Sequence, residues 1–318
     1  MRIILRDENC QKELMQRGYT KVPLLSDAET TNVLNRIHQL NSDNKFNPDG
    51  SQDFGTTLHI THLDKDLSYR KSATNLLYTT FLPYLEKHLV DYKFLAGNLF
   101  VKPPGKGELG IHQNWHFTDN LDDITLSLWC PLVDVDETNG TIQVVEGSHR
   151  ILPEIPNPFC KPYFSDFIES LVKNHSKPIS LKAGECLIFD DSLLHWSGVN
   201  NSSSPRYVVQ GLFIPAEAVS VLYYLNQNHP QKQFEMFEIS SDSFVEERFI
   251  DLMGNPEKLK RLGFVENKNR LITEEEFLQL LRKSNKDRKR IQSSESATKP
   301  KHSVFLERIK SFFRHKVL

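Results

Sequence analysis

Cysteine is scarce in this sequence, and long hydrophobic runs are missing. The cysteines Cys10, Cys130, Cys160 and Cys186 show no paired spacing, which argues against a disulfide framework and a cysteine zinc site. No stretch approaches the roughly 18 apolar residues that a membrane-spanning helix needs. Charged residues follow Met1 too early for the apolar region of a secretory signal. We therefore expect a soluble, cytoplasmic protein with reduced cysteines.

The composition is that of a globular protein with an unusual end. Hydrophobic residues make up 38% and charged residues 25% of 318, which excludes a disordered or fibrous chain. Residues 281–318 carry a net charge of +9, so the remaining 280 residues carry −11 of the total −2. Residues 304–318 form a basic amphipathic stretch with Phe305, Ile309 and Phe312 on one face. Such a stretch fits weak contact with a membrane surface or a protein better than with nucleic acid.

The hydrophobic period changes from helical to two near residue 92. Before that point, the spacing of apolar residues predicts helices over 26–40 and 69–88. After it, short runs alternate apolar and polar residues, and turns separate them: 94–102, 124–130, 141–145, 179–182, 186–189 and 206–214. This pattern predicts a sandwich, barrel or jelly roll of short strands, with helices packed around it.

Two histidines within the strand-rich part are candidates for metal binding. A mononuclear non-haem iron(II) site needs two imidazoles and one carboxylate on one face, with the opposite face open. In a β-barrel, two ligands lie two residues apart and a distant histidine faces them. His112, Asn114 and His195 have this spacing, although an amide stands where a carboxylate is expected.

Two residues that follow His195 could bind an anion. Arg206 lies eleven residues after His195 on the next predicted strand, and its planar guanidinium suits a carboxylate. Ser197 would project on the same face as His195 and could donate from its hydroxyl. A buried Arg also serves often as a structural ion pair, so this pattern alone leaves both roles open.

The order of these and other motifs resembles the phytanoyl-CoA dioxygenase family over about residues 10–215. The motifs that carry the resemblance are Gly18-Tyr19 with residues 24–29, residues 102–105 with 111–115, residues 129–134 with Asn139-Gly140 and 147–149, and residues 184–189 with 195–197, Asn200 and Arg206. The resemblance implies a double-stranded β-helix (a cupin-like jelly roll), mainly β with flanking helices. It also implies an Fe(II)- and 2-oxoglutarate-dependent dioxygenase that uses O2 to hydroxylate a small or lipid-like organic substrate.

The same resemblance assigns roles to individual residues. It implies that His112 and His195 bind iron, with Asn114 at the position of the third ligand. It implies that Arg206 and Ser197 hold the distal carboxylate of 2-oxoglutarate. Gln113 and Trp129 match positions that line the co-substrate pocket in relatives.

Asn114 departs from the family, which has Asp at this position. Three alternatives follow: Asn114 ligates through its oxygen, Asp119 or His116 supplies or orients a replacement ligand, or iron binding is lost. The last alternative describes a catalytically inactive relative that binds a ligand or partner through the old pocket. The retained Arg206 and Ser197 favour the enzyme, because an inactive pocket has no need of a co-substrate clamp.

The sequence suggests four segments. Residues 1–90 are expected to give helical support, and residues 91–215 the oxygenase core. Residues 216–283 are expected to form a helical extension. Residues 284–318 are expected to be a basic linker that leads into the amphipathic tail.

Overall fold

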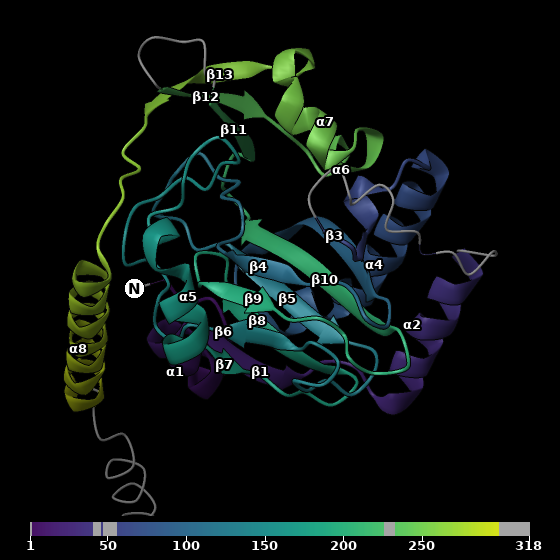
Figure 1. The fold of residues 1–318 in the computed structure, drawn as a ribbon, viewed down its shortest axis with the longest axis horizontal. Helices are drawn as coiled ribbons and strands as arrows, with labels where there is room; N and C mark the ends of the chain where they lie inside the picture. The colour runs from purple at the N-terminus through teal and green to yellow at the C-terminus, as the bar shows by residue number, and fades with distance from the viewer. Residues whose placement is uncertain (1, 41–45, 47–55, 226–232, 299–318) are drawn as a thin grey trace, which may run out of the picture.

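Two antiparallel β-sheets stacked against each other form the centre of the protein (Figure 1). The computed structural model describes residues 2–40, 46, 56–225 and 233–298. The chain crosses repeatedly between the two sheets from β3 to β10, which gives a double-stranded β-helix, or jelly roll. The expected fold class, mainly β with flanking helices, is confirmed.

In each sheet, the spatial order of the strands differs from their order along the chain. The larger sheet has the order β1-β8-β5-β10-β3-β2 and the smaller one β4-β9-β6-β7. The larger sheet comprises β1 Tyr19–Pro23, β2 His59–Ile60, β3 Tyr92–Lys102, β5 Leu126–Pro131, β8 Glu185–Asp190 and β10 Arg206–Pro215. The smaller sheet comprises β4 Leu109–His112, β6 Ile142–Val144, β7 Lys177–Pro178 and β9 His195–Ser197.

Alternation along the strands of the larger sheet separates two layers of side chains. On β5, Leu126 and Leu128 face the helices outside the sheet, whereas Trp129 joins the cluster between the sheets. On β8, Ile188 faces outward and Leu187 inward in the same way. This period of two directs every second residue of β5, β8 and β10 toward the interior of the barrel.

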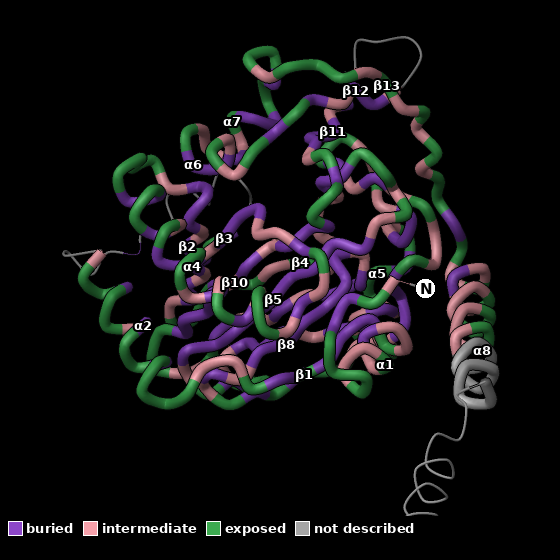
Figure 2. The backbone as a smooth tube through the Cα atoms, turned by 180° about the vertical axis from the view of Figure 1, so that it is seen from behind, coloured by how far each residue is buried: buried purple, intermediate pink, exposed green. Residues whose placement is uncertain are grey.

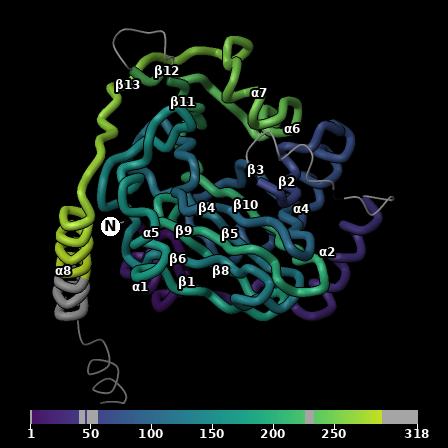
Figure 3. The backbone as a smooth tube through the Cα atoms, in the orientation of Figure 1, coloured from purple at the N-terminus to yellow at the C-terminus, as the bar shows by residue number. Residues whose placement is uncertain are grey.

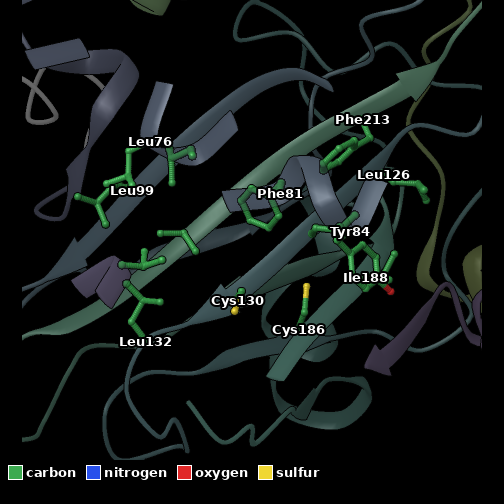
Figure 4. Packing of buried hydrophobic residues seen from close by; sticks show 14 of the residues in the cluster. Leu76, Phe81, Tyr84, Leu99, Leu126, Cys130, Leu132, Cys186, Ile188 and Phe213 are labelled. Carbon is green, nitrogen blue, oxygen red and sulfur yellow. The ribbon is translucent and has the colours of Figure 1, made fainter. Parts of the chain in front are cut away.

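Three helices cover the outer face of the larger sheet: α1 Glu8–Arg17, α2 Asp27–Leu40 and α4 Leu67–His88. Phe81 and Tyr84 of α4 point into the cluster of apolar side chains on this face (Figure 4). The rings of Phe81 and Phe213 meet edge to face at 6.0 Å between centroids. The buried segments in Figure 2 concentrate in the sheets, while the outer sides of these helices are exposed.

The secondary structure of the segment after β10 differs from the expected one. Residues 216–283 were expected to be helical, but they contain a three-stranded antiparallel sheet of β11 Val221–Leu225, β12 Gln233–Glu238 and β13 Arg261–Glu266. The short helices α6 Ser243–Glu246 and α7 Phe249–Gly254 connect β12 to β13. The three strands are only five or six residues long, so their period of two is hard to distinguish in the sequence. Figure 3 shows this unit across one end of the jelly roll.

The last described helix corrects a second expectation. Residues 284–300 were expected to form a linker, but α8 Glu274–Thr298 continues through most of them. No Pro or Gly lies between Thr273 and Thr298, and Lys, Arg, Gln and Glu are good helix formers. Phe277 anchors α8 in a cluster with Tyr163, beside the short helix α5 Ile168–Ser170. The amphipathic tail expected at 304–318 lies outside the described residues.

All four cysteines are free, as expected. Cys130 and Cys186 are buried in the cluster beneath α4. Within the described part of the chain, no helix has the length and apolar character needed to cross a membrane.

Candidate active site

His112 and His195 lie opposite each other on neighbouring strands of the smaller sheet. They are register partners in the β4–β9 pair, and their ring centroids are 4.2 Å apart. Nδ1 of His112 lies 2.7 Å from the carbonyl oxygen of Gly110, and Nδ1 of His195 lies 2.8 Å from that of Leu193. Because a carbonyl only accepts, both protons reside on Nδ1, and both Nε2 atoms keep a lone pair for a metal.

Burial keeps this pair neutral. Burial lowers the pKa of His112 and, with a smaller effect from the neighbouring His112, lowers the pKa of His195 well below its usual value. Neutral imidazole is the form that ligates divalent metals. Each ring therefore offers a neutral Nε2 donor within the same cavity.

Asn114 lies in the same cavity as the two histidines, with its side-chain orientation fixed. Its Nδ2 donates to Oδ1 of Asp191 at 2.8 Å and to Oγ of Ser127 at 2.9 Å. Its backbone N–H donates to the carbonyl of Asp191 at 2.8 Å. Both amide hydrogens are used, so Oδ1 is the atom that Asn114 has free to accept a cation.

A buried carboxylate therefore lies directly behind the position where the family has one. Asp191 is 2% exposed, and its Oδ1 also accepts from Oγ of Ser127 at 2.6 Å. Burial raises the pKa of Asp191 to about 7, against the effect of these hydrogen bonds. Gln210 completes the network by donating to Oγ of Ser127 at 2.7 Å.

The other proposed substitutes for a carboxylate ligand lie elsewhere. Oδ1 of Asp119 accepts from the backbone N–H of Val219, on the segment that leads into β11. Nε2 of His116 lies 2.9 Å from Oγ1 of Thr118. Neither Asp119 nor His116 lines the cavity that contains His112 and His195.

Two buried cations lie side by side at the other end of this cavity. Arg206 and Lys102 are register partners in the β10–β3 pair and are 3% and 1% exposed. Nζ of Lys102 donates to Oγ of Ser197 at 2.8 Å, and Arg206 donates to the carbonyl of Gly140. Nε of Arg206 is buried without a hydrogen-bond partner. Among the described residues, neither cation has a carboxylate within salt-bridge distance.

This arrangement suits the binding of an anion. Burial lowers the pKa of Arg206 to about 9 and, together with the charge of Arg206, that of Lys102 to about 6. A carboxylate between them would favour both charged forms and satisfy the free guanidinium N–H. The ring of Trp129 supports Arg206, whose Cζ lies 5.4 Å from the ring centroid. Sequence reasoning assigned no role to Lys102, although it begins the Lys-Pro-Pro-Gly motif.

Three further polar residues do not line the cavity that contains His112 and His195: Gln113, His59 and His62. The side-chain amide of Gln113 donates to the carbonyl of Ser192, and the residue lines a neighbouring, larger cavity. His59 shares a hydrogen bond of 2.9 Å with the hydroxyl of Tyr69, whereas His62 lines the larger cavity. Searched over the described residues, no group of three His, Cys, Asp or Glu side chains could hold a metal ion.

The larger cavity, of about 490 Å³, also reaches His112 and Asn114. Its walls come from β2 to β4, from the loop around Glu154 and from α6 and α7 of the C-terminal unit. A volume of this size suits a metabolite, and its contact with the histidine pair makes it the place where a substrate would bind.

The jelly roll places two imidazoles with free Nε2 lone pairs and two buried basic side chains in one cavity. This arrangement suits a metal-dependent oxygenase that uses a keto acid as its co-substrate. The sequence profile described as phytanoyl-CoA dioxygenase (PhyH) matches residues 14–208. The chain belongs to this family. It is a 2-oxoglutarate-dependent dioxygenase that uses Fe(II) and O2 and acts on a small molecule.

Individual relatives are distant. A probable alpha-ketoglutarate-dependent hypophosphite dioxygenase from Stutzerimonas stutzeri is 24% identical over 258 residues, which are 76% of this chain and 89% of that protein. A phytanoyl-CoA dioxygenase domain-containing protein 1 homolog from Dictyostelium discoideum is 26% identical over 52% of this chain and 58% of its own length. The structure of the epimerase SnoN in complex with Fe3+, alpha ketoglutarate and nogalamycin RO is 20% identical, with a TM-score of 0.49, over 67% of this chain and 85% of that one.

The residues present fit the cofactor and co-substrate of this class. Two free Nε2 lone pairs and the free Oδ1 of Asn114 form a donor set for a divalent metal. The unpartnered Nε of the buried Arg206 fits a carboxylate. When bound, iron supplies the activation of O2, coupled to oxidation of 2-oxoglutarate to succinate and CO2.

Proposed function

We propose that His112, His195 and Asn114 bind Fe(II) and that the chain hydroxylates a small or lipid-like organic substrate in the larger cavity. The observation that carries this proposal is the orientation of the two imidazoles, whose Nδ1 atoms are held by carbonyls and whose Nε2 atoms are free. Oδ1 of Asn114 is the third donor, because Asp191 and Ser127 take both amide hydrogens.

Arg206, Lys102 and Ser197 hold the distal carboxylate of 2-oxoglutarate in this proposal. The two basic side chains lack carboxylate partners in the described chain, and the Ser197 hydroxyl accepts from Lys102 on the strand that also carries His195. Trp129 stacks on Arg206 and keeps water from the ion pair. Gln113 takes a positioning role, because its amide fixes the chain after His112 to Ser192.

Asp191 would supply the negative charge of the missing aspartate, because a cation bound nearby favours its ionised form. Its carboxylate lies one hydrogen bond behind the amide of Asn114 and polarises that amide, which makes Oδ1 a better donor to a cation. The metal site would keep nearly the same local charge, although the formal charge has moved away from the metal.

An organic substrate suits the larger cavity better than a small oxyanion. Hypophosphite, for which the Stutzerimonas stutzeri relative is named, is far smaller than the cavity of about 490 Å³. No Lys or Arg is among the described residues that line this cavity. Nothing there would balance the charge of an oxyanion.

Anaerobic titration of the apo protein with Fe(II) and 2-oxoglutarate tests the proposal. We expect the visible charge-transfer band that forms only when the keto acid chelates iron. Arg206→Ala should abolish 2-oxoglutarate binding while the circular dichroism spectrum stays unchanged. Arg36→Ala, on the exposed side of α2, is the matched control and should leave the band intact. A wild-type chain without a band, or full 2-oxoglutarate affinity in Arg206→Ala, would contradict the proposal.

A further inference from the structure

The ionisable Asp, Glu, Lys and Arg side chains that line the larger cavity are of acidic type alone in the described chain. Glu154 is the one acidic residue among the described residues that line it, and no Lys or Arg accompanies it. The adjoining cavity is also acidic, since Asp122, Asp123 and Asp190 line it. Its one cation, Arg150, donates to the carbonyls of Asp122 and Asp123 and is occupied there. The basic side chains of Lys102 and Arg206 line the other cavity, together with His112 and His195.

Glu154 presents a partly free carboxylate to this cavity. Its Oε1 accepts from the backbone N–H of Tyr163 at 3.0 Å, and no salt bridge reaches it in the described part of the chain. The environment disfavours its charge, since burial raises the pKa of Glu154 to about 7. A cation brought by a ligand would relieve this burial cost, because an opposite charge favours the ionised form.

Aromatic rings form the wall opposite the jelly roll. Phe244 and Phe249, from α6 and α7, meet Phe117 and Trp115 edge to face at 5.2 and 5.3 Å between centroids. His62 lies over Phe244 at 5.5 Å. These faces suit a hydrocarbon body, and aromatic faces also tolerate a nearby cation.

One buried arginine holds this wall in place. Arg70 of α4 donates from Nε to the carbonyl of Val245 at 2.8 Å and from Nη2 to that of Glu246 at 3.0 Å. Its Nη1 donates to the carbonyl of Asp64 at 2.6 Å. The carbonyls of Val245 and Glu246 lie at the C-terminal end of α6, where a helix leaves its carbonyls without partners. Because Arg70 belongs to α4, these hydrogen bonds hold α6 against α4.

We infer that the substrate is a largely apolar molecule that carries one amino group, with its ammonium paired to Glu154 and its body between the aromatic wall and the histidine pair. This inference rests on the proposed function, because it takes the larger cavity as the substrate site. The separation of charge keeps the substrate and the dianionic co-substrate in different cavities. An anionic head group would meet Glu154 and acidic neighbours with no cation to balance it.

Displacement of Nile red from the iron-free full-length chain tests the inference without turnover. Decylamine, decanol and decanoate share one hydrocarbon body and differ in head group. At pH 8 we expect decylamine to bind about tenfold or more tightly than decanoate, the size expected for a charged hydrogen bond. Glu154→Gln should bring the amine and the alcohol to within about twofold of each other, with the alcohol unchanged. Glu169→Gln, on the exposed side of α5, is the matched control.

The outcomes separate this inference from the proposed function. Equal or stronger binding of decanoate, or an amine preference that survives Glu154→Gln, would overturn the inference. If none of the three probes displaces Nile red while the iron–keto-acid band forms, the substrate class is wrong and the dioxygenase site stands. If decylamine binds as expected and the band is missing, the iron and co-substrate residues are wrong and the cavity assignment stands.

Discussion

Asp191 holds Asn114 through two hydrogen bonds of 2.8 Å, one from the backbone N–H to its carbonyl and one from Nδ2 to its carboxylate. The first bond fixes where the chain passes after β4, and the second fixes which end of the amide faces the cavity. An asparagine at this position would otherwise be free to turn its NH2 group toward a metal, which an amide nitrogen does not ligate. The carboxylate of Asp191 therefore determines that Asn114 has its oxygen, and not its nitrogen, free for a metal.

Asp191→Asn should weaken Fe(II) binding by about 10- to 100-fold, the range seen when a partner of a metal ligand is lost. The new amide can donate to Oδ1 of Asn114 and so compete with the metal. The measurement is an anaerobic Fe(II) titration followed by calorimetry. Asp190→Asn is the control, because that carboxylate accepts from the N–H and hydroxyl of Ser192 and not from Asn114. Equal affinities for the two variants would rule out the positioning role of Asp191.

Exchanging the two residues tests where the charge is needed. The double variant Asn114→Asp with Asp191→Asn keeps the net charge and moves the carboxylate to the ligand position. We expect at least about tenfold tighter Fe(II) binding than in the wild type, because a carboxylate is a better donor to a divalent cation than an amide. Unchanged affinity would mean that position 114 does not contact the metal.

Arg70→Ala should loosen the aromatic wall and spare the metal site. Loss of three hydrogen bonds from a charged donor should lower the free energy of unfolding by about 4 kcal/mol or more, since each such bond contributes ~1.5–3 kcal/mol. We expect faster amide exchange across 243–254 and weaker Nile red binding, with an unchanged charge-transfer band. Arg36→Ala serves again as the control. A band that weakens as much as dye binding would contradict the separation of wall and metal site.

Glu154 should give the chain a pH-dependent stability. Its pKa is about 7 in the folded chain and near 4.5 when exposed, so the folded state binds the proton more tightly. Its contribution is therefore full below about pH 4.5 and is lost as the pH rises through 7. Tyr163 faces the carboxyl with its backbone N–H, and burial also raises the pKa of that phenol, which stays neutral over this range.

Glu154→Gln should accordingly be more stable than the wild type at pH 8, by about 1–2 kcal/mol after allowance for partial exposure. Below about pH 4.5 the two chains should unfold alike, because the wild-type carboxyl is protonated in both its folded and unfolded states. Urea unfolding at both pH values measures the difference. A gap of the same size at low and high pH would show that burial does not raise this pKa.

Much of the architecture could be predicted from the sequence, because long alternating runs fix which side of a strand faces the core. The strands at 94–102 and 206–214 were recognised in this way, and β3 and β10 are the two longest strands of the sheet. The histidines and Arg206 could be found because each has a distinctive chemistry next to a strand. The sheet of β11 to β13 was missed because its strands are only five or six residues long, too short for a clear period of two.

Residues that matter through their neighbours were harder to find. Lys102 gains its environment from its register with Arg206, more than a hundred residues later, and a single sequence does not reveal register. Asp191 directly follows Asp190, the last residue of β8, where an aspartate is sufficiently explained as the end of a strand. Glu154 lies in a loop among prolines with no periodic pattern. The environment of each depends on a partner that the fold brings to it from a distant part of the sequence.

The aromatic wall has a consequence for how this enzyme can diverge. Phe244 and Phe249 belong to the unit that follows β10. All four proposed site residues lie before the end of β10: His112, Asn114, His195 and Arg206. Substitutions on the cavity side of the segment between β12 and β13 would change the shape of the larger cavity without changing any of these four residues. Selection for a new substrate could therefore act on this segment, provided that its buried contacts with β3 and β10 are kept.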